Sequence, residues 1–185
     1  MLGSSGGAQI GLNLAARYPK RVHTLVAHEP PCVQLLPDAA ENRAFTEGVY
    51  ETYRSDGAGP AMRKLEMGAG LSGGPQQVKA ATQSAPPPEM QEIFGRIMGN
   101  LDFFMAHGVK PISFYVPDVA TLRAGSVRVK VGIGETSTGQ LAHRAAVALA
   151  DRLGTAPVFF PGDHGGYGGQ PAAFGERLHQ VLSGA

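Results

Sequence analysis

The sequence predicts an α/β protein built on a parallel sheet. Apolar segments with the composition of strands lie at residues 22–28, 127–134 and 156–160, and each stops at a turn containing Gly or Pro. Helical patterns precede, separate and follow these segments. Because strands and helices alternate along the chain, helical crossovers join neighbouring strands, which is the arrangement of a parallel sheet.

Helices are expected where apolar side chains recur at helical spacing. Those that accompany the strands lie at residues 10–16, 141–153 and 171–182. Others fall in a long middle segment, at residues 38–54, 61–67 and 89–107. Joints rich in Gly or Pro are expected between them, at residues 57–60, 68–74 and 85–88.

A G-x-S-x-G element opens the chain at residues 3–7 and runs directly into the first helix. This pattern predicts a nucleophile elbow, a sharp strand-to-helix turn whose small flanking residues avoid a Cβ clash. We expect Ser5 to be the nucleophile, with the N–H of Gly6 facing the oxyanion at the positive end of the helix. Ser4 is expected to be a turn residue. Only Met1 and Leu2 precede the motif as a strand.

With further motifs downstream, the chain resembles the α/β-hydrolase family over nearly its whole length. The motifs are a Tyr-Pro-x-x-Val sequence at residues 18–22, and a Gly-Asp-His loop at 162–164 before a Pro-x-x-Phe helix. In that family the triad order is serine, acid, histidine, with the histidine on a loop after the last strand. The resemblance therefore implies Ser5 as nucleophile and His164 as base.

The resemblance also implies that the chain is the C-terminal part of an α/β-hydrolase fold with a helical cap insertion. The family's first strands and the loop that donates the second oxyanion-hole N–H lie upstream of the elbow, so we expect the N-terminal half to be lacking. We expect residues 1–31 and 127–185 to form the hydrolase core. Residues 32–126 are expected to form the cap, or a plain helical subdomain that buries its own apolar stripe.

The acid of the triad is open between two glutamates. The commonest family position lies three residues past Gly134, at Ser137, which cannot act as the acid. Glu29 directly follows the strand at 22–28, and residues 21–29 are similar to the haloalkane-dehalogenase branch, whose acid comes from this point. Glu135, directly after Gly134, is the alternative. We expect Glu29 to be the acid that orients His164.

Composition excludes several classes of function. The 185 residues carry a formal net charge of +1, which gives no electrostatic footprint for nucleic acid. No apolar run approaches the ~18 residues that a membrane span needs. Cys32 is the only cysteine, so no intrachain disulfide forms. The histidines lack ligand spacing and the glycine-rich turns lack a P-loop lysine, so we expect no metal and no cofactor. With a single cysteine and no signal-like or membrane-spanning pattern, we expect a cytoplasmic location.

Serine at the elbow indicates acyl transfer. We expect a serine hydrolase that cleaves a small ester or thioester through an acyl-enzyme. Alternative hypotheses are an N-terminally truncated, weakly active or inactive hydrolase fragment, and a non-catalytic binding module. Without upstream strands the elbow strand would be an exposed sheet edge, through which the chain could self-associate.

Overall fold

The structure is a computed structural model that describes residues 1–70 and 88–184. The chain divides into two compact units. The sheet unit comprises Met1–Ala40 and Ile112–Ala185, and the helical unit comprises Glu41–Pro111. We describe each unit by itself.

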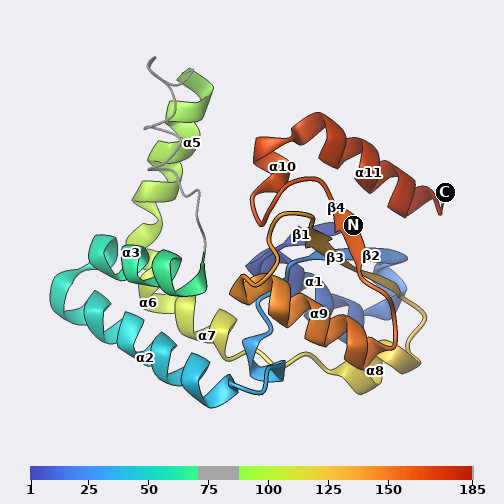
Figure 1. The fold of residues 1–185 in the computed structure, drawn as a ribbon, viewed down its shortest axis with the longest axis horizontal. Coiled ribbons are helices and arrows are strands. Elements are labelled where there is room, and N and C mark those ends of the chain that lie inside the picture. The colour runs from blue at the N-terminus through green and yellow to red at the C-terminus, as the bar shows by residue number, and fades with distance from the viewer. Residues whose placement is uncertain (71–87, 185) are drawn as a thin grey trace. The chain divides into compact units, whose positions relative to one another are not determined.

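The sheet unit contains a parallel sheet of four strands in the order β1-β2-β3-β4 (Figure 1). The strands are β1 (Leu2–Ser4), β2 (Thr24–His28), β3 (Arg128–Gly134) and β4 (Val158–Phe160). The predicted α/β class and the parallel pairing are confirmed. Each of the three predicted strands begins one or two residues later than expected. β1 is short, with three residues that end at the elbow.

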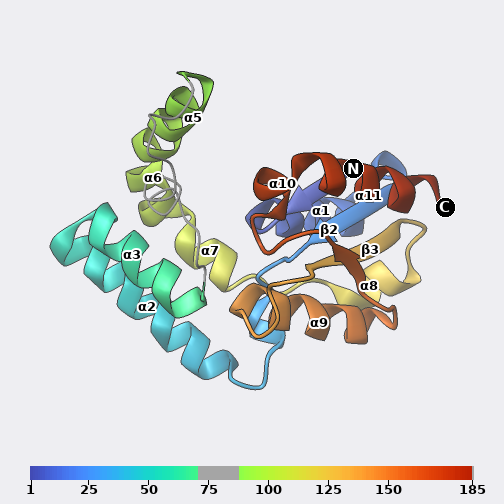
Figure 2. The same ribbon diagram turned by 45° about the horizontal axis from the view of Figure 1, so that its top comes forward.

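Helices cover both faces of this sheet (Figures 1 and 2). One face carries α1 (Gly6–Arg17), α8 (Val119–Ala124) and α9 (Leu141–Leu153), while α11 (Pro171–Ser183) covers the other. The strands supply both faces because successive side chains alternate. On β2, Leu25 and Ala27 face the α1 side, and Val26 packs with Phe160 and Phe174 on the α11 side. All of β2 is therefore buried, as its continuous apolar sequence predicts.

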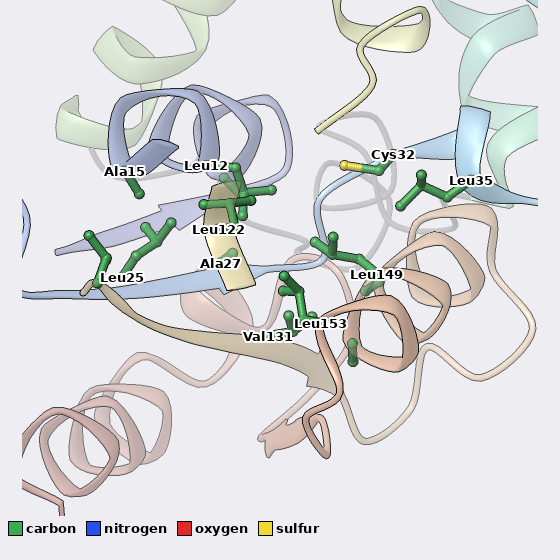
Figure 3. Close-up of a cluster of buried hydrophobic side chains, with 14 of the residues drawn as sticks. Leu12, Ala15, Leu25, Ala27, Cys32, Leu35, Leu122, Val131, Leu149 and Leu153 are labelled. Carbon is green, nitrogen blue, oxygen red and sulfur yellow. The ribbon is translucent and has the colours of Figure 1, made fainter. Parts of the chain in front are cut away.

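The larger core cluster lies between the sheet and the helices α1, α8 and α9 (Figure 3). Helix α1 contributes Ala8, Leu12 and Ala15, which recur at helical spacing on one side of the helix. Helix α9 contributes several alanines together with Leu149 and Leu153. The helices predicted at 10–16, 141–153 and 171–182 are confirmed.

Short elements escaped the sequence analysis because they are too brief for a periodic pattern. They are η1 (Pro19–Arg21), η2 (Val33–Leu35), α7 (Val109–Ser113), α8 and α10 (Gly166–Gly169). Helix α8 begins with a capping interaction, in which Asp118 Oδ1 accepts a hydrogen bond of 2.9 Å from the N–H of Thr121. Such a cap satisfies a backbone donor that the helix itself leaves unpaired.

The helical unit is built from α2 (Ala39–Asp56), α3 (Ala58–Ala69), α5 (Pro88–Gly99), α6 (Leu101–His107) and the start of α7. Its own core contains Val49, Ala61, Met105 and Val109. The expected insertion ran from 32 to 126, whereas residues 32–40 and 112–126 belong to the sheet unit. The role of the helical unit as a cap stays a prediction.

Two predictions about the middle segment were wrong. The single helix expected at 89–107 is two helices, since α5 ends at Gly99 and α6 begins at Leu101, with Asn100 between them. Gly99 and Asn100 are both poor helix formers. The joint expected at 57–60 is only Gly57, since α3 already begins at Ala58 and its first turn accommodates Pro60 without losing a hydrogen bond.

The other two expected joints are described only in part. Helix α3 continues through Gly68 and ends at Gly70, which has a left-handed backbone. Residues 71–74 lie outside the described residues. The same holds for residues 85–87 of the last joint, and Pro88 already belongs to α5.

β1 stands at one end of the strand order, and the predicted self-association through its edge stays a prediction. Within the described residues, every helix is too short or too polar to cross a lipid bilayer.

Candidate active site

The G-x-S-x-G motif forms a tight turn between β1 and α1. β1 ends at Ser4, α1 begins at Gly6, and Ser5 stands between them with φ 53° and ψ −126°. Positive φ is unfavourable for a residue with a side chain, so the turn is strained. The N–H of Ser5 donates to the carbonyl of His28 at 2.9 Å, which ties the turn to the end of β2.

The first turn of α1 presents unpaired amides. The N–H groups of Ala8 and Gln9 donate to the carbonyl of Ser5, whereas those of Gly6 and Gly7 have no acceptor among the described residues. The Ser5 hydroxyl makes no capping hydrogen bond. The turn therefore leaves a hydroxyl and two N–H groups free at the positive end of the helix, where negative charge is stabilised.

Only the first glycine of the motif is required by packing. A Cβ on Gly3 would lie 2.4 Å from the carbonyl oxygen of Gly7, inside any real contact distance. A Cβ on Gly7 would meet nothing within 4 Å. The expectation that small residues are needed on both sides of Ser5 is therefore wrong at Gly7, because the space that a side chain would occupy there is open.

Glu29 lies at the carboxyl end of β2, next to the elbow. It is fully buried, and its N–H donates to the carbonyl of Gly132 at 2.9 Å. Its φ of 43° is positive. Among the described residues other than glycine, only Ser5 and Glu29 have positive φ. Backbone strain of this kind concentrates at functional sites, because the surrounding structure must hold it in place.

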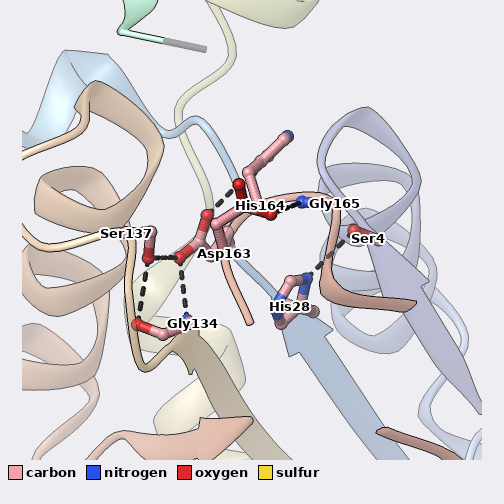
Figure 4. Close-up of polar contacts among 8 residues, drawn as sticks. Ser4, His28, Gly134, Ser137, Asp163, His164 and Gly165 are labelled. Carbon is pink, nitrogen blue, oxygen red and sulfur yellow. Dashed lines mark hydrogen bonds and ion pairs between the residues drawn. The ribbon is translucent and has the colours of Figure 1, made fainter. Parts of the chain in front are cut away.

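Three groups donate hydrogen bonds to the Glu29 carboxylate. Oε2 receives Nδ1 of His164 at 2.8 Å, and Oε1 receives the N–H of Gly134 at 2.9 Å and the hydroxyl of Ser137. Figure 4 shows Gly134, Ser137 and His164 gathered at this edge of the sheet. Burial raises the pKa of Glu29, but the hydrogen bonds from His164, Ser137 and Gly134 outweigh it and lower the pKa. The carboxylate is therefore charged at neutral pH.

His164 lies on the loop after β4, as predicted. This loop is fastened to the end of β3, since the N–H of Thr136 donates to the carbonyl of Gly162 at 3.0 Å. Gly134 permits this approach, because a Cβ there would lie 2.7 Å from the same carbonyl oxygen. Asp163 turns away from the site and accepts the N–H of Gly165 at 2.8 Å.

The contact with Glu29 selects one tautomer of His164. A carboxylate only accepts, so Nδ1 carries the proton, and Nε2 is left as a proton acceptor. The side chain of His164 is 18% exposed, so the ring can meet a ligand. A buried carboxylate that orients an accessible imidazole is the arrangement that the base half of a catalytic triad requires.

The structure brings some predicted residues together and leaves others apart. Glu29 and His164 are hydrogen bonded, and the pairing of Ser4 with His28 sets Ser5 and Glu29 at the ends of adjacent strands. Within the described residues the Ser5 hydroxyl makes no hydrogen bond to His164. The side chain of Glu135 is exposed and makes no hydrogen bond or ion pair with His164 within the described residues, and its N–H donates to the carbonyl of Phe160 at 3.0 Å.

Ser137 makes a contact in the site that the sequence did not reveal. It is fully buried, and its hydroxyl contacts Glu29 from the position where the resembled family commonly carries the acid itself. The sequence did offer one signal for a place in the site, which was the position of Ser137 three residues after Gly134. The sequence could exclude Ser137 as an acid, but it could not show which carboxylate the hydroxyl meets.

His28 is a second buried histidine beside the site. Its Nδ1 lies 3.1 Å from the hydroxyl of Ser4, and its ring stacks on His164 with centroids 6.4 Å apart (Figure 4). Burial lowers the pKa of His28 to about 4, with a smaller lowering by His164 that Glu29 and Asp163 oppose. His28 is therefore neutral near pH 7, and it ties the elbow to β2 without adding charge.

No group of three or more His, Cys, Asp or Glu side chains in the described part of the chain is arranged to hold a metal ion.

Comparison with known proteins finds a similar sequence and similar solved structures. No protein-family model matches the chain. It is 31% identical over 188 residues to the uncharacterized hydrolase YraK of Bacillus subtilis (strain 168), covering 98% of this chain and 62% of that protein. The chain also resembles the crystal structure of a proline iminopeptidase from Mycobacterium smegmatis, with a TM-score of 0.55 and 18% identity.

The structural likeness confirms the predicted fold class. It covers 98% of this chain and 64% of the iminopeptidase. The chain thus spans less than two thirds of the length of both proteins it is compared with.

The close approach at Gly3 predicts unequal effects of two alanine substitutions. We expect Gly3→Ala to lower the free energy of unfolding by at least ~1–3 kcal/mol, the usual cost of overpacking. Gly7→Ala is the matched control in the same turn, and it should cost little because its Cβ meets nothing within 4 Å. Urea unfolding measures both, and equal losses would contradict the described turn.

The buried His28 predicts a pH dependence of stability. Its folded pKa of about 4 lies below the ordinary histidine value of 6.5, so the unfolded chain binds more protons between these values. The unfolding free energy should therefore be highest above pH 6.5 and fall by about 3 kcal/mol as the pH drops to 4. Glu29, whose pKa is lowered from 4.5 in the folded protein, reduces the unfolding free energy further only below about pH 4.5.

Urea unfolding across this pH range tests the assignment to His28. In His28→Gln the fall should largely disappear, whereas His179→Gln, which removes an exposed histidine of α11, should retain it. A fall of full size in His28→Gln would assign the pH dependence to another group.

Proposed function

We propose that the chain is a serine hydrolase of the α/β-hydrolase family that cleaves a small ester or thioester through an acyl-enzyme. The observation that carries the proposal is the 2.8 Å contact between Glu29 and His164, beside the strained elbow at Ser5. The similarity to a protein named as a hydrolase and the shared fold of a proline iminopeptidase support it.

In the proposed first half-reaction, His164 Nε2 takes the proton of the Ser5 hydroxyl while Oγ attacks the carbonyl carbon. The Gly6 N–H stabilises the oxyanion, and Glu29 stabilises the imidazolium through Nδ1. The tetrahedral intermediate collapses and its C–O or C–S bond breaks. The leaving alcohol or thiol takes the proton from His164, and the acyl group stays on Ser5.

In the second half-reaction, water gives a proton to His164 and its oxygen attacks the acyl carbon. Collapse of this intermediate breaks the ester bond to Ser5 and releases the carboxylic acid. The proton held by His164 returns to the Ser5 oxygen. Glu29 remains ionised in both halves, which agrees with the lowered pKa that its three hydrogen-bond donors produce.

The competing proposal is a weakly active or inactive fragment, or a non-catalytic binding module. It is favoured by the free Ser5 hydroxyl, which has no hydrogen bond to His164 within the described residues. Catalytic hydrogen bonds are often long in a protein without its substrate, so this gap does not exclude catalysis.

Covalent labelling distinguishes the two proposals. A fluorophosphonate probe should form one adduct that peptide mapping assigns to Ser5. Among the described serines, this one combines an unpaired hydroxyl with free amides, beside the strand end where Glu29 binds His164. Ser5→Ala should lose the adduct, while Ser183→Ala, an exposed serine of α11, should keep it. An adduct on Ser4, or none in the wild-type protein, would count against the serine hydrolase.

The position of Glu29 predicts which carboxylate is needed for turnover. With p-nitrophenyl acetate, Glu29→Gln should lower kcat on the order of 10⁴-fold, the loss typical of a removed tautomer partner. Glu135→Gln should change kcat little, because that side chain is exposed and Glu29 is the carboxylate that binds His164. Circular dichroism checks that both variants fold. The opposite order of severity would assign the acid to Glu135.

A further inference from the structure

Ile112 lies against the first residue of α1, where the proposed oxyanion donor is found. A Cβ on Gly6 would lie 3.0 Å from Cδ1 and 3.5 Å from Cγ1 of Ile112. Both residues belong to the sheet unit and are half-buried. The isoleucine side chain therefore fills the space that a side chain at position 6 would otherwise occupy, directly beside the Gly6 peptide.

Two side-chain amides hold the backbone of this segment in place. Nε2 of Gln9, on the second turn of α1, donates to the carbonyl of Ile112 at 3.0 Å. Nε2 of Gln34, in η2, donates to the next carbonyl, that of Ser113, at 2.9 Å. Gln9 is 4% exposed, so its hydrogen bond is shielded from water. Because different elements of the same unit hold consecutive carbonyls, Ile112 keeps a defined position over the elbow.

The chemistry of the elbow places the substrate's acyl group next to this side chain. A carbonyl oxygen that accepts from the Gly6 N–H has its carbon within reach of Ser5 Oγ, and the acyl chain must then extend past the same turn. Isoleucine offers no hydrogen bond and is branched at Cβ, so it contributes apolar contact and steric limitation. It also keeps water from part of the Gly6 peptide.

We propose that Ile112 is a specificity-determining residue that forms a wall of the acyl-binding subsite and restricts it to short apolar acyl groups. This inference rests on the proposed function, since it takes Ser5 as the nucleophile and Gly6 as the oxyanion donor. It assigns the acyl class of the substrate, and it makes a residue outside the triad responsible for that preference.

Chain-length selectivity tests the wall. The measured quantity is the ratio of kcat/KM for p-nitrophenyl hexanoate to that for p-nitrophenyl acetate. Ile112→Ala should raise this ratio at least about 10-fold, because the fit of a single methylene already changes rates by 10-fold or more. Ile112→Phe should lower the ratio. Val116→Ala is the matched control, an exposed aliphatic residue of the same segment, and it should leave the ratio unchanged.

The rates at which fluorophosphonates label Ser5 provide a second test, which does not depend on catalytic turnover. Fluorophosphonates with a methyl or a hexyl group on phosphorus place that group where an acyl chain would lie. Ile112→Ala should raise the hexyl-to-methyl ratio of labelling rates at Ser5, and Ile112→Phe should lower it. Unfolding midpoints similar to wild type confirm that the variants fold.

The outcomes separate this inference from the proposed function. Labelling of Ser5 with the same chain-length ratio in wild type, Ile112→Ala and Ile112→Phe would overturn the assignment of Ile112 alone. Absence of labelling at Ser5 by both probes would overturn the proposed function and this inference with it.

Discussion

The hydrogen bonds to the Glu29 carboxylate are the interaction on which the site depends. A buried carboxylate is costly unless donors surround it. Here the donors come from the end of β3, from the turn after it and from the loop after β4, so a single side chain directly after β2 connects the carboxyl ends of three strands. Because the same donors lower its pKa, Glu29 stays charged and can orient His164. Loss of the carboxylate would leave the imidazole without a fixed tautomer.

The elbow is held to this centre by β2. Ser5 donates its N–H to the carbonyl of His28, the last residue of β2, and Glu29 follows directly. The strained backbones of Ser5 and Glu29 are thus joined through one residue, whose neutral side chain packs against Phe160 and Phe174. Burial of His28 is therefore part of how the sheet unit fixes the spacing between the nucleophile candidate and the acid candidate.

The sequence predicted the strands and the core helices, because apolar runs and turn residues report on local structure. The choice of Ser5, Glu29 and His164 came from the elbow motif and the resemblance to the hydrolase family, and their catalytic roles stay a prediction. The sequence did not predict the contact between Ser137 and Glu29, which depends on how the turn after β3 lies against β2. The placement of Ile112 was equally hidden, since residues 112 and 6 are distant in sequence and only tertiary structure joins them. The helix break at Asn100 had a local signal, but the amphipathic pattern continues across it.

The central claim is that Ser5 carries the acyl group during turnover. Acid quenching during steady-state hydrolysis of p-nitrophenyl acetate, followed by intact-mass measurement and peptide mapping, tests it most directly. We expect one acetyl group on Ser5 in the wild-type protein, and no such adduct in Ser5→Ala. An acetyl group on another residue, or hydrolysis by Ser5→Ala at the wild-type rate, would contradict it.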